Sequence, residues 1–375
     1  MKILIAMDSF KGSLTSLETA NAVEEGILQV TNTHSIIKTP IADGGEGTVD
    51  AFTQALNGKR IYLEVHDPLM RKIRAYYGLL PNKVAVIEMA QASGITLLKA
   101  DELNPLYTTT YGLGDMIKDA LKHHVNTIII GVGGSATNDA GIGMLASLGY
   151  KFYDRYKAPL QPIGENLIHI NEVDASHAVK LPKDVNILVA TDVINPLYGP
   201  NGAAHIYAPQ KGANKEIVKI LDKGLKHYAS YIYNIESIDL QKIKGSGAAG
   251  GLPASLIPYL KATLKPGIEL VFDAINLEEQ ISKADLIITG EGKIDIQTLM
   301  GKAPLGVIKI ADKYNKPVIV LAGQITKEGN ELKKYKNVSL YNINNMNQEN
   351  DIMNTKTAYK NTLNTIKNII ININD

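Results

Sequence analysis

The chain has 375 residues, of which 45% are hydrophobic and 21% are charged, and its formal net charge at pH 7 is +1. This length predicts about two domains, each with a core of its own. The balanced charge excludes a global field that would attract nucleic acid or an anionic membrane. The absence of cysteine excludes disulfides, thiolate nucleophiles and cysteine-based metal sites, and it is compatible with the cytoplasmic location that we expect. No apolar run approaches the length of a membrane span or a signal sequence.

The first third of the chain predicts alternating strands and helices. Residues 3–7 form an apolar run and residues 35–39 a second strand-like run, and each precedes a polar loop and a predicted helix. Open parallel sheets bind ligands at the carboxyl ends of their strands. Carboxylates beside glycines suit Mg²⁺ or hydroxyl groups, whereas a lysine suits a phosphate. The candidate ligand-binding residues in these two loops are Asp8, Ser9, Lys11, Asp43 and Glu46.

The character of the sequence changes near residue 60. Residues 61–65 and 73–80 read as two strands joined by a short link, which predicts an antiparallel or mixed sheet. Arg71 lies in that link, and its planar guanidinium could pair with a substrate carboxylate. A solvated hairpin arginine is the alternative interpretation of the same residue.

Residues 126–149 contain the most suggestive segment of the chain. The strand-like run Ile128 to Ile130 is followed by glycines, by polar residues and by a stretch to Leu148 that predicts a helix. Glycines let backbone N–H groups approach an anion, and the start of a helix adds unpaired donors. We therefore expect a site for a phosphate or a carboxylate here, and either anion fits. The residues that would form it are Gly133, Gly134, Ser135, Thr137, Asn138 and Asp139.

The same segment has a second interpretation. Gly131, Gly133 and Ala136 fit the pattern G-x-G-x-x-[G/A], and Asp154 follows at a distance typical of a dinucleotide-binding fold. This alternative predicts an NAD-dependent dehydrogenase of a small hydroxy acid. It explains only this one loop, and it requires an apolar helix start where the sequence is polar.

The last third of the chain returns to parallel α/β alternation. Two more predicted strands, at residues 186–190 and 285–288, end in polar loops. The loops carry Asp192 in the first case and Glu291, Lys293 and Asp295 in the second. Because both chain ends have parallel character and the middle does not, we predict an α/β protein of two domains. Residues 1–60 and 280–375 would form a Rossmann-like or flavodoxin-like domain, and residues 61–279 an inserted mixed α/β domain, with the active site in the cleft between them.

The acids, lysines and glycine loop at these strand ends are the groups that phosphoryl transfer requires. Backbone N–H groups and lysines bind phosphates, carboxylates hold Mg²⁺, and one further carboxylate accepts the proton of the attacking hydroxyl group. Strand ends of one sheet face the same edge, so these groups are expected to converge.

Seven motifs, in this order, closely resemble those of the bacterial type-one glycerate kinases over nearly the whole chain. They are DSFKGS at 8–13, ADGGEGT at 42–48, GGSATND at 133–139, TDVINPLYGPNGAA at 191–204, PQKGA at 209–213, GAAGG at 247–251 and GEGKIDIQTLMGK at 290–302. The resemblance implies ATP-dependent phosphorylation of D-glycerate with Mg²⁺, and 2-phosphoglycerate as the product. The alternative product is 3-phosphoglycerate, since the sequence does not show which hydroxyl group faces the γ-phosphate.

Specific roles follow as hypotheses. We expect Lys11 to contact phosphate oxygens and Asp192 to act as the general base, with Glu291 and Asp295 as the other candidates for the base. The metal ligands would be Asp43 and Asp192. The substrate-binding set would be Asp8, Ser9, Arg71, Asp43, Glu46, Glu291 and Asp295. The nucleotide-binding set would be the glycine loop from Gly133 to Asp139 together with Lys293.

Overall fold

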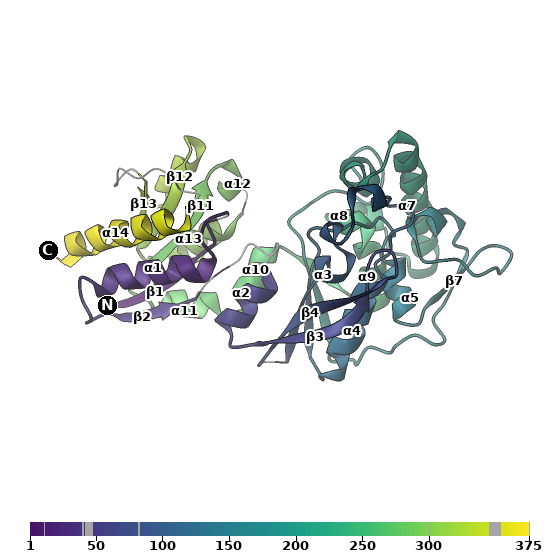
Figure 1. The fold of residues 1–375 in the computed structure, drawn as a ribbon, viewed down its shortest axis with the longest axis horizontal. Coiled ribbons are helices and arrows are strands. Elements are labelled where there is room, and N and C mark those ends of the chain that lie inside the picture. Colours follow the sequence, from purple (N-terminus) through teal and green to yellow (C-terminus); the bar gives the residue numbers. More distant parts are fainter. Residues whose placement is uncertain are drawn as a thin grey trace. The chain divides into compact units, whose positions relative to one another are not determined.

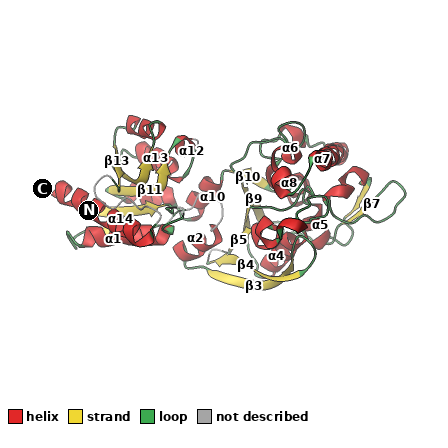
Figure 2. Ribbon diagram, turned by 45° about the horizontal axis from the view of Figure 1, so that its top comes forward, coloured by secondary structure: helices red, strands yellow, loops and turns green. Residues whose placement is uncertain are grey.

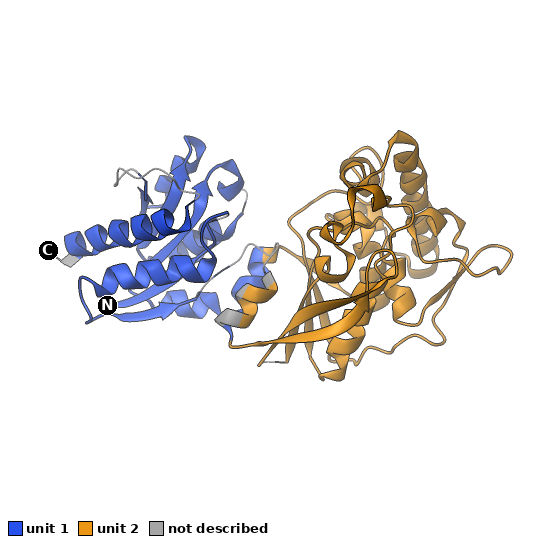
Figure 3. Ribbon diagram, viewed as in Figure 1, with its two compact units in different colours: residues 1–47, 54–56, 268–375 blue, residues 48–53, 57–267 orange. Residues whose placement is uncertain are grey.

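The computed structural model describes residues 1–10, 12–39, 41, 48–81, 83–299, 301–344 and 354–374. The chain divides into two compact units, which are coloured separately in Figure 3. Unit 1 comprises Met1–Gly47, Gln54–Leu56 and Ile268–Asp375, and unit 2 comprises Thr48–Thr53 and Asn57–Gly267. Unit 1 is therefore assembled from both chain ends, whereas unit 2 is nearly continuous in sequence.

Unit 1 is built on a five-stranded sheet in the order β13-β12-β11-β1-β2, and every neighbouring pair is parallel. Its strands are β1 (Lys2–Met7), β2 (Ser35–Lys38), β11 (Leu286–Ile294), β12 (Val318–Ile325) and β13 (Val338–Asn342). Its helices are α1 (Ser16–Leu28), α10 (Gly267–Ala274), α11 (Leu277–Lys283), α12 (Ile296–Leu299), α13 (Ala303–Lys313) and α14 (Thr355–Asn374), with a 3-10 segment η6 (Glu328–Lys334).

Helices cover both faces of the sheet of unit 1, and the interior strand β1 is buried on both of its faces. Ile3 and Ile5 of β1 pack with α1 and α14, whereas the intervening Leu4 and Ala6 are buried on the opposite face. Helices α1 and α14 lie side by side in Figure 1. Their close approach depends on Gly26, because a Cβ atom there would lie 2.4 Å from Cγ2 of Ile366.

Local signals explain where α1 begins. The hydroxyl group of Thr15 accepts a hydrogen bond from the N–H of Glu18, and the carboxylate of Glu18 accepts one from the N–H of Thr15. This reciprocal capping box satisfies two backbone donors that a helix start leaves unpaired. The helix predicted after the first polar loop is confirmed, and Thr15 is its N-cap.

Unit 2 is built on a six-stranded mixed sheet in the order β10-β9-β6-β5-β4-β3, much of which can be followed in Figure 2. Its strands are β3 (Lys59–His66), β4 (Lys72–Leu80), β5 (Val84–Glu88), β6 (Thr127–Gly131), β9 (Asn186–Ala190) and β10 (Thr263–Lys265). Strand β4 is antiparallel to β3 and β5, and the remaining pairs are parallel. The predicted α/β class, with a parallel sheet from both chain ends and a mixed sheet between them in sequence, is confirmed.

Short helices and one small ribbon complete unit 2. The ribbon pairs β7 (Lys151–Tyr153) with β8 (Glu172–Asp174). The helices are α2 (Thr48–Ala55), α3 (Ala90–Ser93), α4 (Tyr111–Lys122), α5 (Ile142–Ser147), α6 (Ala203–Tyr207), α7 (Lys215–Glu236), α8 (Ala248–Gly251) and α9 (Pro253–Leu260). The 3-10 segments are η1 (Ile95–Leu97), η2 (Ala100–Glu102), η3 (Gly164–His169), η4 (Pro209–Lys211) and η5 (Leu240–Lys242). Within the described ranges, none of these helices combines the length and the apolar character that a membrane span requires.

Two expectations about the strand ends are wrong. The predicted helix after the glycine loop begins only at Ile142, so residues 135–139 form an irregular segment and not a helix start. The polar strand ends also do not share one sheet. Asp8 follows β1 and Glu291 lies within β11, which extends to Ile294 instead of ending at residue 288 as predicted; both strands belong to unit 1, whereas the glycine loop and Asp192 follow strands of unit 2.

Candidate active site

The carboxyl edge of the sheet in unit 1 brings together two of the predicted acids. Met7 pairs with Gly290 in the parallel register, so Asp8 and Glu291 follow neighbouring positions on adjacent strands. Strand β11 then continues to Ile294 along β12 alone. Asp8 is 4% exposed and Glu291 is 5% exposed. Both carboxylates are therefore held at the rim of the sheet and largely screened from bulk water.

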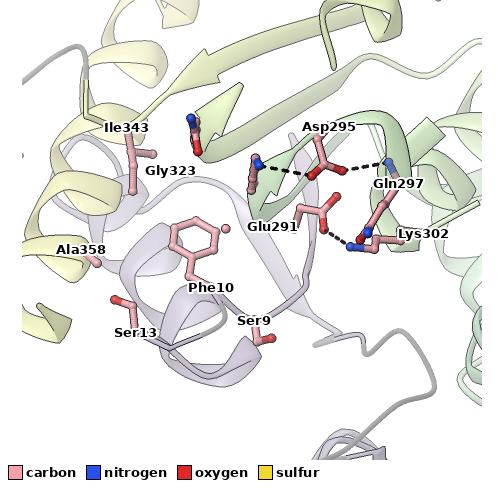
Figure 4. Close-up of a pocket in the computed structure, with 13 residues that line it drawn as sticks. Ser9, Phe10, Ser13, Glu291, Asp295, Gln297, Lys302, Gly323, Ile343 and Ala358 are labelled. Atoms are coloured by element: carbon pink, nitrogen blue, oxygen red, sulfur yellow. Dashed lines mark hydrogen bonds and ion pairs between the residues drawn. The ribbon is translucent and has the colours of Figure 1, made fainter. Parts of the chain in front are cut away.

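A pocket of about 320 Å³ opens at this edge. Figure 4 shows a polar wall with Glu291 and Lys302, and an apolar wall with Phe10, Ile343 and Ala358. The pocket is lined by Ser9, Phe10, Ser13, Glu291, Gly292, Lys293, Asp295, Gln297, Lys302, Gly323, Gln324, Ile343 and Ala358. A mostly apolar pocket with a few convergent charged groups is the usual form of a small-molecule site.

The polar wall carries both signs of charge. One carboxylate oxygen of Glu291 accepts a hydrogen bond from the hydroxyl group of Thr298 at 2.5 Å, and the other lies 3.9 Å from Nζ of Lys302. Because Thr298 occupies one oxygen, the other faces the lysine and the pocket. Lys302 can therefore balance the charge of Glu291 or that of a bound phosphate.

Asp295 adds a second carboxylate to the same wall. It accepts a hydrogen bond from the N–H of Gln297 at 2.9 Å and lies 3.6 Å from Nζ of Lys293. Burial opposes ionisation of Asp295, but backbone donors and the charges of Lys302 and Lys293 outweigh it and hold its pKa below the ordinary value. Asp295 is consequently an anion at neutral pH.

This donor set fits a magnesium–nucleotide complex better than a metal held by protein alone. Within the described ranges, no group of three or more histidine or acidic side chains is placed to hold a metal ion. Mg²⁺ is commonly held by one or two carboxylates together with substrate phosphates. Glu291 and Asp295 supply such carboxylates, and Lys293 and Lys302 supply cations for phosphate oxygens.

The carboxyl edge of the sheet in unit 2 carries a different group of candidates. Glu88, Gly131 and Ala190 occupy adjacent register positions on β5, β6 and β9. The glycine loop leaves this edge directly after Gly131. Gly133 and Gly134 are exposed, and a Cβ atom at Gly133 would meet nothing within 4 Å. This part of the loop is open to a ligand.

The rest of the glycine loop is buried. Thr137, Asn138 and Asp139 are each 0% exposed, so in this structure their side chains present no surface to a nucleotide. Asp139 instead accepts hydrogen bonds from the N–H and the hydroxyl group of Thr110, both at 2.8 Å, and from the N–H groups of Gly141 and Gly143. It thereby ties the start of α4 to the start of α5, a structural role that the predicted nucleotide contact did not anticipate.

The two remaining candidates of unit 2 have partners within the unit. Asp192 is exposed just beyond β9, and its Oδ1 accepts a hydrogen bond from the N–H of Gly267 at 3.1 Å. Arg71 pairs with Asp67 at 2.5 Å and with Glu102 at 2.6 Å. Its side chain is still 45% exposed, so a carboxylate ligand would have to share it with these two acids. Lys11, Asp43 and Glu46 lie outside the described residues.

Sequence reasoning missed three charged residues at these edges. Lys302 lines the pocket of unit 1, Glu88 accepts a hydrogen bond from the N–H of Val49 at 2.8 Å, and Lys211 is buried against the glycine loop. Lys302 and Lys211 belong to motifs quoted for the family resemblance, but their positions along the chain gave no reason to assign them a role. Glu88 directly follows the apolar run at residues 84–87, which was an available signal.

The dinucleotide alternative lacks its structural context. A Rossmann fingerprint needs a helix that starts at the glycines and an acid at the end of the next parallel strand. Here α5 starts at Ile142, and Asp154 lies beyond β7, which pairs with β8 in a two-stranded sheet separate from the six-stranded one. Asp154 accepts hydrogen bonds from the N–H groups of Tyr156 and Ala158 and so stabilises a turn.

Two α/β sheets, one parallel and one mixed, whose edges carry carboxylates, lysines and an open glycine loop are the framework expected of a phosphotransferase of small molecules. Comparison with known proteins agrees. The family described as "Glycerate kinase family" matches residues 3–374. A glycerate kinase of Bacillus subtilis is 44% identical over 92% of this chain and 90% of its own length. A glycerate 2-kinase of Escherichia coli is 46% identical over 87% and 86%, respectively.

Solved structures include a match of the same kind. A crystal structure from Salmonella typhimurium LT2, of a protein assigned as glycerate kinase 2, superposes with a TM-score of 0.90 at 41% identity. The match covers 100% of this chain and 98% of that one. The chain belongs to the glycerate kinase family. It is accordingly an ATP-dependent kinase that transfers a phosphoryl group to an alcohol.

Proposed function

We propose that the protein phosphorylates the C2 hydroxyl group of D-glycerate with Mg²⁺-bound ATP and releases ADP and 2-phosphoglycerate. The observation that supports this most directly is the 46% identity with the glycerate 2-kinase of Escherichia coli over 87% of the chain. The pocket of unit 1, with two carboxylates facing two lysines, supplies chemistry suited to that reaction.

In the proposed reaction, the C2 hydroxyl oxygen attacks the γ-phosphorus of ATP. The bond between that phosphorus and the bridging oxygen of ADP breaks, and the hydroxyl proton passes to a carboxylate of the enzyme. Catalysis of this transfer rests on positioning and on neutralising charge. The reaction needs cations that bind the phosphoryl oxygens, a carboxylate that accepts the proton and a group that binds the carboxylate of the substrate.

We assign these tasks as follows. Lys11, Lys293 and Lys302 contact phosphate oxygens, and the exposed N–H groups of Gly133 and Gly134 bind an anionic group of ATP or glycerate. Asp192 accepts the hydroxyl proton, because it is an exposed carboxylate at a strand end. Further substrate contacts are proposed for Asp8, Ser9, Asp43, Glu46 and Arg71.

Glu291 and Asp295 in the pocket of unit 1 are carboxylates that would hold Mg²⁺. Asp43 and Asp192 are the two metal ligands proposed from the sequence. Bound Mg²⁺ would neutralise phosphate charge. Asp295 is suited to such binding because its pKa is held low, which keeps it ionised without a metal. Thr298 orients Glu291 by donating to one of its oxygens, so the other oxygen keeps a defined direction toward Lys302.

The test is a turnover assay that separates the two phosphoglycerates. Purified protein is incubated with ATP, Mg²⁺ and D-glycerate, and the product is offered to enolase, which accepts 2-phosphoglycerate directly. We expect immediate enolase-dependent absorbance. If the signal appears only after phosphoglycerate mutase is added, the product is 3-phosphoglycerate and the proposed regiochemistry is wrong. Absence of ADP formation together with tight NAD binding would defeat the kinase proposal as a whole.

A further inference from the structure

Lys211 is a buried lysine that the proposed mechanism does not use. It is 2% exposed, although lysine is almost never fully buried without partners for its ammonium group. Its Nζ donates to Oγ of Ser135 and to the carbonyl oxygen of Thr137, both at 2.7 Å. Both partners belong to the glycine loop, which lies more than seventy residues earlier in the chain.

The PQKGA motif places this lysine. Pro209 opens the short segment η4, and Gly212 closes it with a left-handed φ of +94°. A Cβ atom at Gly212 would lie 2.2 Å from the carbonyl oxygen of Leu103, so no larger residue fits there. The N–H of Ala213 donates a hydrogen bond to the carbonyl oxygen of Ala208 at 3.1 Å. The turn is therefore rigid, and it directs the side chain of Lys211 inward.

The glycine loop is held from a second side by the GAAGG motif. A Cβ atom at Gly250 would lie 2.1 Å from the carbonyl oxygen of Thr137, the same oxygen that Lys211 contacts. The N–H of Ala140 donates to the carbonyl oxygen of Gly250 at 3.1 Å. Thr137 is thus enclosed between a lysine and a glycine backbone, and only Gly133 and Gly134 of the loop reach the surface.

We propose that Lys211 is the positioning residue of the glycine loop: it holds Ser135 and Thr137 so that the N–H groups of Gly133 and Gly134 face the anionic group of a substrate. The inference rests on the proposed function, because that function gives the loop an anion to bind. Lys211 does not touch the ligand, since its Nζ is enclosed by the loop that it supports. Preorganised donors of this kind lower the cost of binding and of charge development.

The test compares the variant Lys211→Met with a control variant that loses a different polar contact of a buried side chain. Methionine has a similar length but no donor. The control is Tyr77→Phe, which removes a buried hydrogen bond to Asp119 in the same unit, away from the glycine loop. For each variant, kcat and KM are measured separately for ATP and D-glycerate, alongside the thermal midpoint. We expect Lys211→Met to lower kcat/KM by about 10²-fold without a matching fall in the midpoint.

The other variants make the role specific. Lys211→Gln keeps a donor at shorter reach and should recover part of the loss, whereas Tyr77→Phe should lower the midpoint and leave kcat/KM unchanged. A rise of KM confined to one substrate supports the proposal and shows which anion the loop holds. Wild-type kcat/KM for both substrates in Lys211→Met overturns it, as does a loss that follows the thermal midpoint equally in all three variants.

A further pair keeps the proposal testable if Lys211→Met does not fold. Lys211→Gln and Ser135→Ala are then measured singly and combined. If Lys211 acts through Ser135, the combined loss is smaller than the product of the single losses. If the loss of kcat/KM in the combined variant equals the product of the two single losses, the two residues act independently and the proposal is overturned. The wild-type assay separates the two ideas, because absent turnover of D-glycerate defeats the proposed function, whereas normal turnover with an unaffected Lys211→Met defeats only this inference.

Discussion

At the scale of single residues, Asp192 is the proposed acceptor of the hydroxyl proton, and it also holds the backbone at Gly267 by a hydrogen bond. Its Oδ1 accepts the N–H of Gly267, a bond that asparagine would keep because it retains that oxygen. Asp192→Asn therefore removes the basic carboxylate while it preserves the local structure. We expect kcat to fall by about 10²–10⁴-fold with an unchanged thermal midpoint. Turnover near that of the wild type would rule out Asp192 as the base and transfer the role to Glu291 or Asp295, which are tested as Glu291→Gln and Asp295→Asn.

Lys211 makes a separate prediction about stability and pH. Burial lowers the pKa of Lys211 to about 7 from an ordinary 10.5, although the nearby charge of Asp139 opposes the shift. Between these two values the unfolded chain binds more protons than the folded protein, so this group makes the free energy of unfolding rise with pH. Below pH 7 the cost of burying the charge is present in full, and it disappears as pH approaches 10.5.

Lys211→Met has no such group and isolates the effect. We compare the free energy of unfolding of Lys211→Met with that of the wild type. The difference, variant minus wild type, should be largest near pH 7 and should fall by up to about 3 kcal/mol by pH 9.5, because the wild type gains stability over this range. Urea unfolding midpoints of both proteins across this range measure the difference, and titrating groups that do not interact with Lys211 cancel in the comparison. A stability difference that does not change with pH would mean that Lys211 titrates in the folded protein as it does in the unfolded chain.

At the scale of elements, α8 shows how backbone conformation supports the glycine loop. Ala249 and Gly250 have left-handed φ angles of 50° and 69°, so this short segment is not regular helix. The unusual backbone brings Gly250 against the carbonyl oxygen of Thr137, where a side chain has no room. The small residues of GAAGG thus serve close packing of two backbones.

Gly250→Ala tests this packing. The added Cβ must displace the loop and also accept a left-handed conformation, so we expect a loss of more than about 2 kcal/mol in the free energy of unfolding. The matched control is Gly199→Ala, where φ is +89° but a Cβ would meet nothing within 4 Å. That control should lose only the conformational cost of roughly 1–2 kcal/mol. Equal losses in the two variants would show that the contact with Thr137 adds nothing.

At the scale of the whole molecule, the two units differ in how the chain builds them. The core of unit 2 runs from Val65 to Ala262, all within one nearly continuous stretch. In unit 1, β1 lies between β2 and β11, so the middle of that sheet joins segments from opposite ends of the chain. Unit 2 has every strand of its sheet inside residues 48–267, whereas unit 1 cannot complete its sheet from either end alone.

This difference predicts which fragments fold. We expect residues 48–267, expressed alone, to give a cooperative thermal transition and the circular dichroism of an α/β protein, because the core is complete. The matched fragment, residues 268–375, lacks β1 and should remain largely unfolded until residues 1–47 are added. A fragment of residues 48–267 without cooperative unfolding would mean that the two units are not separate domains.

The candidate site was predictable in its parts and not in its arrangement. Asp8, Glu291, Gly133 and Asp192 were recognised because polar residues directly after apolar β-rich runs mark the carboxyl ends of parallel strands. The assignment of these strand ends to two domains followed from the mixed character of the middle segment, but their order within each sheet could not be predicted, because strand order depends on contacts that a local pattern does not encode. Asp139 was taken for a ligand contact because its burial between α4 and α5 follows only from the fold.

The sequence by itself determined the α/β class, the mixed character of the middle segment and the start of α1, since hydrophobic periodicity and capping act over a few residues. Tertiary structure alone decided that the helix after the glycine loop begins at Ile142, because Asp139 turns back to bind Thr110. It also decided that Lys211 supports that loop from a distant part of the chain. Hydrogen bonds between residues that are far apart in the sequence form only after the fold has brought these residues together. A local sequence pattern therefore does not predict such bonds.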